Sequence, residues 1–472
     1  MSFVTGSGLT RYGRHEGRGT LDLMSDSATL ALADAGLVRG DIDALVCGYS
    51  TTLPHLMLST VFAEHFGLKP SYAHAVQLGG ATGFALVMLA HLLVTSGAAK
   101  RVLVVGGENR MTGQSRDSAI QVLAQVGHPV YEVPLGPTIP AYYGLVASRY
   151  MHEFGSTEAD FAELAVLMRR HAALHEGAQF RSPISVADVL ASRPIASPLK
   201  MLDCCPVSDG GCAFVVSAEP EGPNPVRISA AAQLHNAQHV SASASLTDFG
   251  AGACAARALA AAGRTLLEVE HAAIYDSFTI TLTMLLEEIG LAPRGRAGAL
   301  AREGHFDADG AMPLNLHGGL LSYGHCGVAG AMAHLAETHL QMTGRAGACA
   351  ARALAAAGRT LADVEHAAIY DSFTITLTML LEEIGLAPRG RAGALAREGH
   401  FDADGAMPLN LHGGLLSYGH CGVAGAMAHL AETHLQMTGR AGARQARRAG
   451  VSLLHGDGGV MSSHVSLVLE SA

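Results

Sequence analysis

The sequence predicts an α/β fold in which strands and helices alternate through two similar halves. Apolar, strand-like runs alternate with helices that begin at proline or end at glycine. The same order starts again after the Pro- and Gly-containing linker at 219–225. With 49% hydrophobic and 15% charged residues, the 472-residue chain can bury a large core, so we expect two sheets in two or three domains.

The first half, residues 1–222, shows this alternation most clearly. We expect strands at 2–10, 43–50, 101–109 and within 201–220, and helices at 20–36, 54–67 and 81–96. The stretch 112–200 interrupts the pattern with prolines and scattered helices. Such a long irregular connection predicts a loop domain or lid.

One segment of this half resembles a transmembrane helix by its length. Residues 78–99 contain no Lys, Arg, Asp or Glu. The segment lies between strand-like runs, and Lys100 and Arg101 follow it, where positive charge suits the carboxyl end of a helix. We therefore predict a helix buried inside the protein and no membrane span.

The second half, residues 223–472, repeats the style of the first. We expect strands at 226–234 and 271–278, helices at 250–263, 279–290 and 328–342, and a terminal hairpin at 451–470. A glycine-rich loop at 316–327 opens the last of these helices.

This half contains a 95-residue block twice, at 251–345 and 346–440. The copies differ only where Leu267 and Glu268 become Ala362 and Asp363. Known repeats are about 20–50 residues long and diverge between units, so this block indicates a recent tandem duplication or an error in the gene sequence. The part of the core formed by residues 1–250 can accept only one copy of the block. The sequence does not determine which copy, or which parts of the two copies, it accepts. The surplus must leave the core, which exposes apolar strands.

Composition and charge exclude several functional classes. A net charge of −10 argues against nucleic-acid binding. Eight cysteines in this length do not form a disulfide framework, and the N-terminus lacks a signal-peptide core, so we expect a reducing cytoplasm. His334 and His339 are five residues apart and do not share a helical face as metal ligands would, so we expect no metal site.

The richest chemical signal is the loop GLLSYGHCG at 319–327, which recurs at 414–422. Its glycines would let the backbone approach a ligand closely. Tyr323, His325 and Cys326 precede a helix, whose positive end suits stabilisation of an oxyanion by His325 and would lower the pKa of the Cys326 thiol. The alternative is that His325 only caps a turn.

Two further glycine turns lie at 77–83 and 455–459. Each by itself is weak evidence, since many strand-to-helix turns contain glycine. Together with the loop at 319–327, they indicate backbone crowding around one ligand the size of a thioester.

The order of these motifs resembles that of the thiolase superfamily, in its sterol-carrier or lipid-transfer type. The family's Cys-Ala-Thr-Gly is matched by Gly80-Ala81-Thr82-Gly83, its SDGAAA strand by 208–213, and its His-Asp-Cys-Phe by Tyr275-Asp276-Ser277-Phe278. Its last motifs are matched by Asn315, Gly318, Gly319, Gly324, His325, Cys326 and the turn from His455 to Gly459. The resemblance implies a five-layer αβαβα fold, a coenzyme A thioester as substrate, no bound cofactor, and a homodimer.

The departures from the family pattern are informative. Gly80 replaces the nucleophilic cysteine, Ser277 the acid/base cysteine and Tyr275 the histidine, while His325 is kept. Without a thiolate at that position, ordinary thiolysis through an acyl-cysteine is not expected. The pattern resembles the steroid side-chain aldolases, which cleave a β-hydroxyacyl-CoA by a retro-aldol step with paired tyrosines. That resemblance implies an OB-fold, zinc-ribbon partner protein.

The sequence therefore predicts the following site, with both copies counted. The catalytic candidates are Tyr275, Tyr323 and His325 with their counterparts Tyr370, Tyr418 and His420. The substrate-binding candidates are Gly80, Asn315, Gly318, Gly319, Cys326, Asn410, Cys421, His455 and Gly458. Four alternatives stay open: an acyltransferase with Cys326 as a relocated nucleophile, a non-catalytic acyl-CoA or lipid carrier, an inactive product of the duplication itself, and tyrosines that only pack.

Overall fold

The computed structural model describes residues 1–175, 177–308, 310–343, 387–388, 391–400, 451–458 and 463–471, the last two segments by their backbone alone. The chain divides into two compact units, one of Met1–His339 with Arg447–Ala472 and the other of Leu340–Ala446. The first unit thus takes in the first copy of the block as far as His339. The boundary predicted between residues 222 and 223 falls inside this unit and stays a prediction about its halves.

The amino-terminal half of the first unit forms a five-stranded part of the sheet, in the order β3-β2-β4-β7-β1. Its strands are β1 (Ser2–Leu9), β2 (Ala44–Gly48), β3 (Tyr72–Val76), β4 (Arg101–Asn109) and β7 (Asp209–Ser217). Helices α1 (Thr20–Ala35) and α2 (Leu58–Phe66) cover one face, where Met24, Leu32 and Phe62 enter a buried apolar cluster. The strands and helices expected in this half are confirmed.

The carboxyl-terminal half continues the same sheet in the order β8-β11-β10-β9. Its strands are β8 (Val226–His235), β9 (His271–Ile274), β10 (Val451–Gly458) and β11 (Ser463–Ser471), accompanied by helices α8 (Ala251–Ala261) and α9 (Thr279–Ile289). Strand β1 pairs with β8 through Ser2–Val4, which joins the halves into one nine-stranded sheet. The two separate sheets that the sequence predicts are therefore continuous, because one strand serves both.

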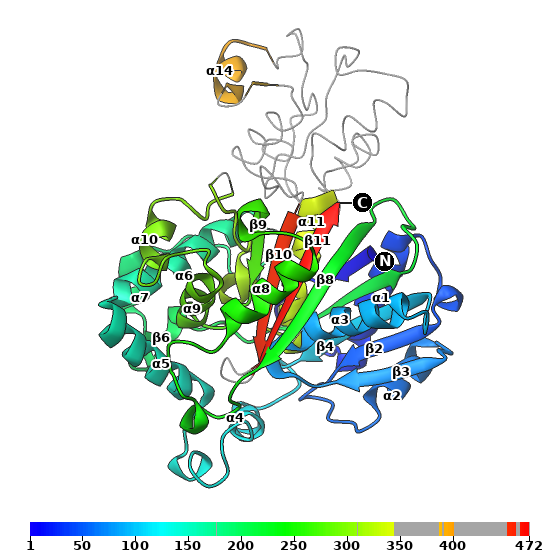
Figure 1. The fold of residues 1–472 in the computed structure, drawn as a ribbon, viewed down its shortest axis with the longest axis horizontal. Helices are drawn as coiled ribbons and strands as arrows, with labels where there is room; N and C mark the ends of the chain where they lie inside the picture. Colours follow the sequence, from blue (N-terminus) through cyan, green and yellow to red (C-terminus); the bar gives the residue numbers. More distant parts are fainter. Residues whose placement is uncertain are drawn as a thin grey trace. The chain divides into compact units, whose positions relative to one another are not determined.

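Helices α3 (Thr82–Thr95) and α11 (Val328–Thr343) lie between the two halves of this curled sheet (Figure 1). Helix α3 packs against β2 and β4 on one side and against β10 and β11 on the other. A Cβ atom at Gly83 would lie 2.8 Å from Met332, so α3 and α11 pack closely. The αβαβα layering follows, and the charge-free segment is a largely buried helix as expected. Within the described residues, no helix is long and apolar enough to cross a membrane.

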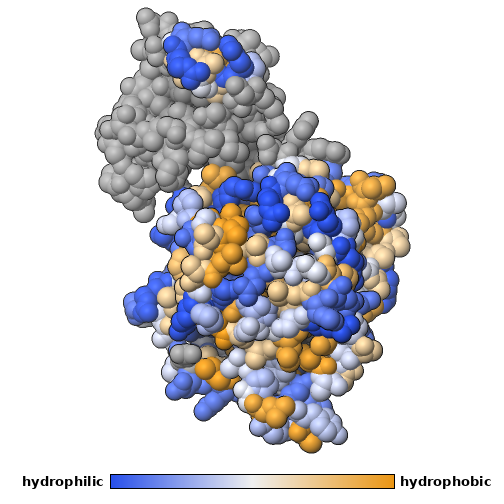
Figure 2. Space-filling view, turned by 90° about the vertical axis from the view of Figure 1, so that its left-hand side faces the viewer, coloured by the Kyte–Doolittle hydropathy of each residue, from blue (hydrophilic) through white to orange (hydrophobic). Residues whose placement is uncertain are grey.

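The described part of the irregular stretch 112–200 contains four α-helices, a short 3-10 turn at Val133–Leu135 and a small hairpin. The α-helices and the strands of the hairpin are α4 (Arg116–Ala124), α5 (Ile139–Phe154), α6 (Glu158–Ala173), α7 (Val186–Ala191), β5 (Pro194–Ala196) and β6 (Leu199–Lys200). Helix α6 packs against α9, against α10 (Ala297–Arg302) and against the turn that carries Tyr323. Figure 2 faces this side of the molecule and shows hydrophobic patches scattered among hydrophilic ones.

Candidate active site

Tyr275 is held at the point where β9 ends and the chain turns into α9. Asn315 fixes this point, because its Oδ1 accepts a hydrogen bond from the Ile274 N–H and its Nδ2 donates to the Ile274 carbonyl, both at 2.8 Å. Asn315 is fully buried and adopts a φ of 44°. Its amide thus positions the strand that presents Tyr275, and its predicted contact with substrate stays a prediction.

The glycine-rich loop forms a single π-helical turn, Gly319–Tyr323, anchored by Asp276. The Asp276 carboxylate accepts hydrogen bonds from the N–H groups of Leu320 at 2.6 Å and Leu321 at 3.4 Å. A Cβ atom on Gly319 would collide with that carboxylate, and one on Gly318 would collide with Ala172 of α6. The backbone crowding predicted here comes from the protein itself, so the assignment of these two glycines to the substrate stays a prediction.

His325 and Tyr275 meet, although they are 50 residues apart in the chain. The Tyr275 hydroxyl lies 3.0 Å from Nε2 of His325. The other ring nitrogen, Nδ1, accepts a hydrogen bond from the Gly327 N–H at 3.2 Å and therefore carries no proton. Since burial, and after it the positive charge of Arg110, lower the pKa of His325 to about 3, the ring is neutral at physiological pH. Its single proton is then on Nε2, which donates to Tyr275 or to a ligand oxygen beside it.

Tyr323 belongs to a cluster of aromatic rings. Its ring makes edge contacts with Tyr12 and His175, each at 4.8 Å between centroids, and a tilted contact with His317 at 5.2 Å. Its side chain is 1% exposed. The structure thus brings Tyr275 and His325 together and surrounds Tyr323 with a different set of partners.

Two of the buried groups behind the site were missed by the sequence reasoning. Asp276, fully buried, lies 3.3 Å from Nε2 of His334 in α11, and burial raises the pKa of Asp276 while His334 opposes that rise. Asp276 stands in the Tyr-Asp-Ser-Phe motif, so the motif was the available signal. For His334 there was no signal, because its partner is 58 positions away.

The thiol of Cys326 does not have the predicted character. The sequence predicts a lowered pKa at a helix N-terminus, but Cys326 is fully buried and burial raises its pKa well above the ordinary value. A nearly dry environment disfavours the thiolate more than the helix end favours it. The prediction of a lowered pKa is therefore wrong.

Gly80 lies in a short 3-10 turn, Gly79–Ala81, immediately before α3. Thr82 stabilises this turn, since its hydroxyl accepts from the Leu78 N–H at 2.8 Å and donates to the Gly79 carbonyl at 2.7 Å. Strand β10, which contains His455 and Gly458, packs against the turn. Two of the three predicted glycine runs therefore belong to neighbouring elements, although 455–458 form part of a strand and not a turn.

The second copy of the block contains the counterparts of the site residues that lie in the first copy. Tyr370, Asn410, Tyr418, His420 and Cys421 lie outside the described residues, and the side chain of His455 does so too. Among the described residues there is no cluster of three or more potential metal ligands.

Comparisons with known proteins follow the layout of the chain. The profile of the thiolase N-terminal domain matches residues 3–220, and the profile of the thiolase C-terminal domain-like region matches twice, over 232–350 and 346–471. A steroid side-chain-cleaving aldolase of Thermomonospora curvata is 31% identical over 371 residues, which cover 72% of this chain and 92% of the relative. An acetyl-CoA acetyltransferase of Methanothermobacter thermautotrophicus is 28% identical over 352 residues, covering 73% and 91%.

Among solved structures, the Ltp2-ChsH2(DUF35) aldolase superposes with a TM-score of 0.69. Its sequence is 24% identical, and the match covers 100% of this chain and 97% of that one. At this identity the likeness supports the fold.

Proposed function

The chain belongs to the thiolase superfamily, and from this premise we propose that it cleaves a carbon–carbon bond of an acyl-CoA thioester by retro-aldol chemistry. The observation that carries the proposal is the contact of 3.0 Å between the Tyr275 hydroxyl and Nε2 of His325, in a chain where Gly80 occupies the place of the nucleophile. The substrate class is a β-hydroxyacyl-CoA. No bound cofactor or metal enters the steps that follow.

The reaction needs a base, an acid and a group that stabilises an enolate. The hydrogen bond from the His325 Nε2–H stabilises the phenolate form of Tyr275, which removes the proton of the β-hydroxyl group. The Cα–Cβ bond then breaks, the β carbon leaves as a carbonyl compound, and the electron pair forms the thioester enolate. His325, which is neutral, donates its Nε2–H to the enolate oxygen, and the Tyr275 phenol returns a proton to Cα.

Replacing each tyrosine by phenylalanine tests this mechanism, with a β-hydroxyacyl-CoA as substrate. We expect Tyr275→Phe to lower kcat by about 100-fold or more, because it removes the acid/base group. The second copy offers a matched control, Tyr370→Phe, for which we expect no change. Unchanged turnover in both Tyr275→Phe and Tyr323→Phe would contradict a mechanism in which a tyrosine is the acid/base group.

Acyl transfer is the second candidate, because an acetyl-CoA acetyltransferase is among the relatives. It requires a reactive thiolate, and burial raises the pKa of both Cys326 and Cys205. We therefore expect alkylation with iodoacetamide to leave turnover unchanged. Loss of acetoacetyl-CoA thiolysis on alkylation would support acyl transfer, and retained CoA-ester binding without turnover on either substrate would support a carrier.

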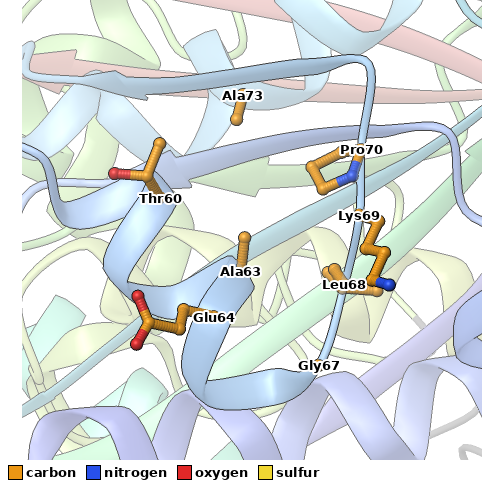
Figure 3. Close-up of a pocket in the computed structure, with 8 residues that line it drawn as sticks. All are labelled: Thr60, Ala63, Glu64, Gly67, Leu68, Lys69, Pro70 and Ala73. Carbon is orange, nitrogen blue, oxygen red and sulfur yellow. The ribbon is translucent and has the colours of Figure 1, made fainter.

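We propose that the protein forms a homodimer through β3. This strand lies at the edge of the sheet, with β2 as its one neighbour in the described sheet, and His74 and Ala75 are exposed. A shallow hollow lies beside it between α2 and β3 (Figure 3). Open strand edges pair readily with a second chain. Light scattering should give twice the chain mass, and Ala75→Lys should give the monomer.

We further propose a partner protein of the OB-fold, zinc-ribbon type. The support is a segment between α4 and α5 that exposes four large apolar side chains: Val130 (66%), Tyr131 (68%), Val133 (40%) and Leu135 (84%). Clustered exposed apolar residues mark interaction surfaces. Co-expression with such a protein from the same organism should give a stable complex, which Tyr131→Ser with Leu135→Ser should dissociate.

We place the protein in the cytoplasm. Six cysteines, namely Cys47, Cys204, Cys205, Cys212, Cys254 and Cys326, are free thiols. Free thiols are typical of a reducing compartment. Fractionation of the source cells tests this placement.

A further inference from the structure

Arg110 follows directly after strand β4 and has no part in the mechanism above. Arg110 begins the turn that follows β4, two residues after Glu108. The Glu108 carboxylate contacts the loop after His325 so closely that a Cβ atom on Gly327 would collide with it. Asp209 anchors the turn beyond Arg110 by accepting hydrogen bonds from the N–H groups of Met111 at 2.6 Å and Thr112 at 3.1 Å. The turn that begins at Arg110 is also held beside the segment from His325 to Gly327, since Ser208, the neighbour of Asp209, donates its N–H to the His325 carbonyl at 3.1 Å.

The guanidinium group of Arg110 lacks a partner there. Its Nε atom is buried and has no hydrogen-bond partner among the described residues. Glu108 carries the nearest negative charge along the chain, but its Oε1 accepts from the Thr51 hydroxyl at 2.8 Å and from the Thr52 N–H at 3.3 Å, and its Oε2 lies against Gly327. A buried donor on a permanent cation is costly unless an anionic oxygen accepts from it.

The positive charge of Arg110 acts on the titratable groups of the site. After burial, Arg110 is the next cause that lowers the pKa of His325, and it also acts on Cys205 and Cys326. His325 is neutral and can supply a hydrogen bond but no charge. The site therefore holds one neutral donor, and near it one cation whose buried Nε–H has no acceptor among the described residues.

We propose that Arg110 contacts the substrate and holds the thioester oxygen as it becomes the enolate oxygen, an inference that rests on the proposed function. When the Cα–Cβ bond breaks, the electron pair moves into a Cα–C double bond and the thioester oxygen gains the negative charge. Arg110 and the Nε2–H of His325 donate to that oxygen from two directions. When Cα takes up a proton, the carbonyl reforms and the oxygen loses its charge. Charge-assisted hydrogen bonds of this kind are about twice as strong as neutral ones.

Two ligands that differ only in charge test the proposal. S-carboxymethyl-CoA carries a carboxylate near the position of the thioester oxygen, and S-carbamoylmethyl-CoA carries a neutral amide of the same shape. Their affinities are measured by calorimetry for the full chain and for Arg110→Met, Arg110→Lys and the surface control Arg302→Met. Methionine matches the length of the arginine stem and is suited to a buried position.

We expect the unsubstituted protein to prefer the carboxylate. Arg110→Met should weaken the carboxylate ligand by about 10- to 100-fold and the amide ligand by less than about 3-fold, because one charge-assisted hydrogen bond is lost. Arg302→Met should match the unsubstituted protein. Equal weakening of both ligands would mean that Arg110 binds another part of coenzyme A, such as its phosphates, and would overturn the proposal, as would no weakening at all.

If Arg110→Met binds neither ligand because it does not fold, the Arg110→Lys variant tests the proposal in its place. The proposal requires that it keeps the amide ligand and weakens the carboxylate, because lysine lacks the planar fork of donors. Turnover of a β-hydroxyacyl-CoA is measured alongside. Absence of turnover in the unsubstituted protein would contradict the proposed function, whereas the ratio of the two affinities still decides the role of Arg110.

Discussion

One helix of the duplicated block is described in both copies, as α10 (Ala297–Arg302) and as α14 (Ala392–Arg397). The two have the same sequence and the same local structure. The arginine before each helix pairs with the glutamate after it, Arg296 with Glu303 at 3.1 Å and Arg391 with Glu398 at 3.2 Å. The block therefore determines this helix locally, whichever copy it lies in.

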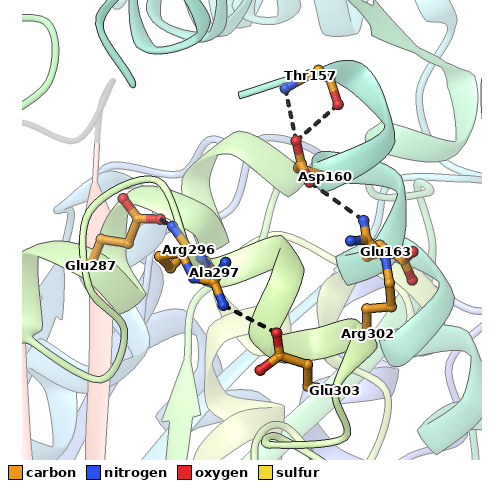
Figure 4. A network of polar contacts seen from close by, with 8 residues as sticks. All are labelled: Thr157, Asp160, Glu163, Glu287, Arg296, Ala297, Arg302 and Glu303. Carbon is orange, nitrogen blue, oxygen red and sulfur yellow. Dashed lines mark hydrogen bonds and ion pairs between the residues drawn. The ribbon is translucent and has the colours of Figure 1, made fainter. Parts of the chain in front are cut away.

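The surroundings of the two helices differ. In α10, a Cβ atom on Gly298 would collide with the Asp160 carbonyl of α6, whereas one on Gly393 in α14 would meet nothing closer than 3.9 Å among the described residues. Figure 4 shows the polar contacts around α10, in which Arg302 donates to Glu163 at 2.6 Å. Asp160 and Glu163 belong to residues 1–250, which occur once in the chain, whereas Glu287 and Glu303 belong to the duplicated block. Identical sequence thus gives identical helices, and the described contacts of the two glycines differ: Gly298 lies against Asp160, whereas Gly393 meets only Arg397 of its own helix.

The largest difference between the copies is expected in catalysis. His325→Ala should lower kcat/KM on a β-hydroxyacyl-CoA by about 100- to 1000-fold, because it removes a donor to the enolate. His420→Ala, the same change in the second copy, should leave kcat/KM unchanged. Steady-state kinetics measure both. Equal losses in the two variants would show that either copy can complete the core and would contradict the asymmetry.

The pH dependence of stability should also separate the copies. Glu288 accepts hydrogen bonds from the N–H groups of Phe249, Gly250 and Ala251 at 3.1, 3.1 and 2.9 Å, yet burial raises its pKa from 4.5 to about 7. The folded state therefore binds a proton more tightly than the unfolded state. Its contribution is fully present below pH 4.5 and is lost as the pH rises through about 7.

We expect Glu288→Gln to remove this loss, which amounts to about 3 kcal/mol in the free energy of unfolding. Urea unfolding across the range measures it. Glu383→Gln in the second copy should keep the pH dependence. If Glu288→Gln leaves the dependence as it was, Glu288 is ionised in the folded state and its three N–H partners outweigh its burial.

The local pattern of apolar and capping residues predicted most helices and strands of this fold. The properties that it did not predict depend on packing between residues that are far apart in the chain. The strands and helices of the first unit follow from apolar periodicity and from caps such as Gly36 and Gly67, both in the left-handed conformation. The sequence also singled out Tyr275 and His325, which do meet. The raised pKa of Cys326 could not be foreseen, because burial depends on how α11 packs against the rest of the chain.

Glycine at the contact between α10 and α6 gives a smaller expected difference, in stability. Gly298→Ala should lower the free energy of unfolding by about 1 to 3 kcal/mol, because the new methyl group overlaps the Asp160 carbonyl. Gly393→Ala should change it by less than about 0.5 kcal/mol, as is usual for surface substitutions. Chemical denaturation compares the two. A larger loss for Gly393→Ala than for Gly298→Ala would mean that the second copy, not the first, packs against α6.

The smallest expected difference lies in the surface ion pairs of the same helix. Arg302 pairs with Glu163 at 2.6 Å, and its own side chain is 52% exposed. Such exposed pairs contribute less than about 1 kcal/mol. Arg302→Ala should therefore lower the free energy of unfolding by a few tenths of a kcal/mol, and by less at high salt, which screens the pair. Arg397 has no acidic partner in the described part of the chain, so Arg397→Ala should have no salt-dependent effect. Denaturation at low and high salt measures both variants. Equal, salt-dependent losses of unfolding free energy in the two variants would show that Arg397 of α14 also has an acidic partner. The two copies would then not differ in this ion pair.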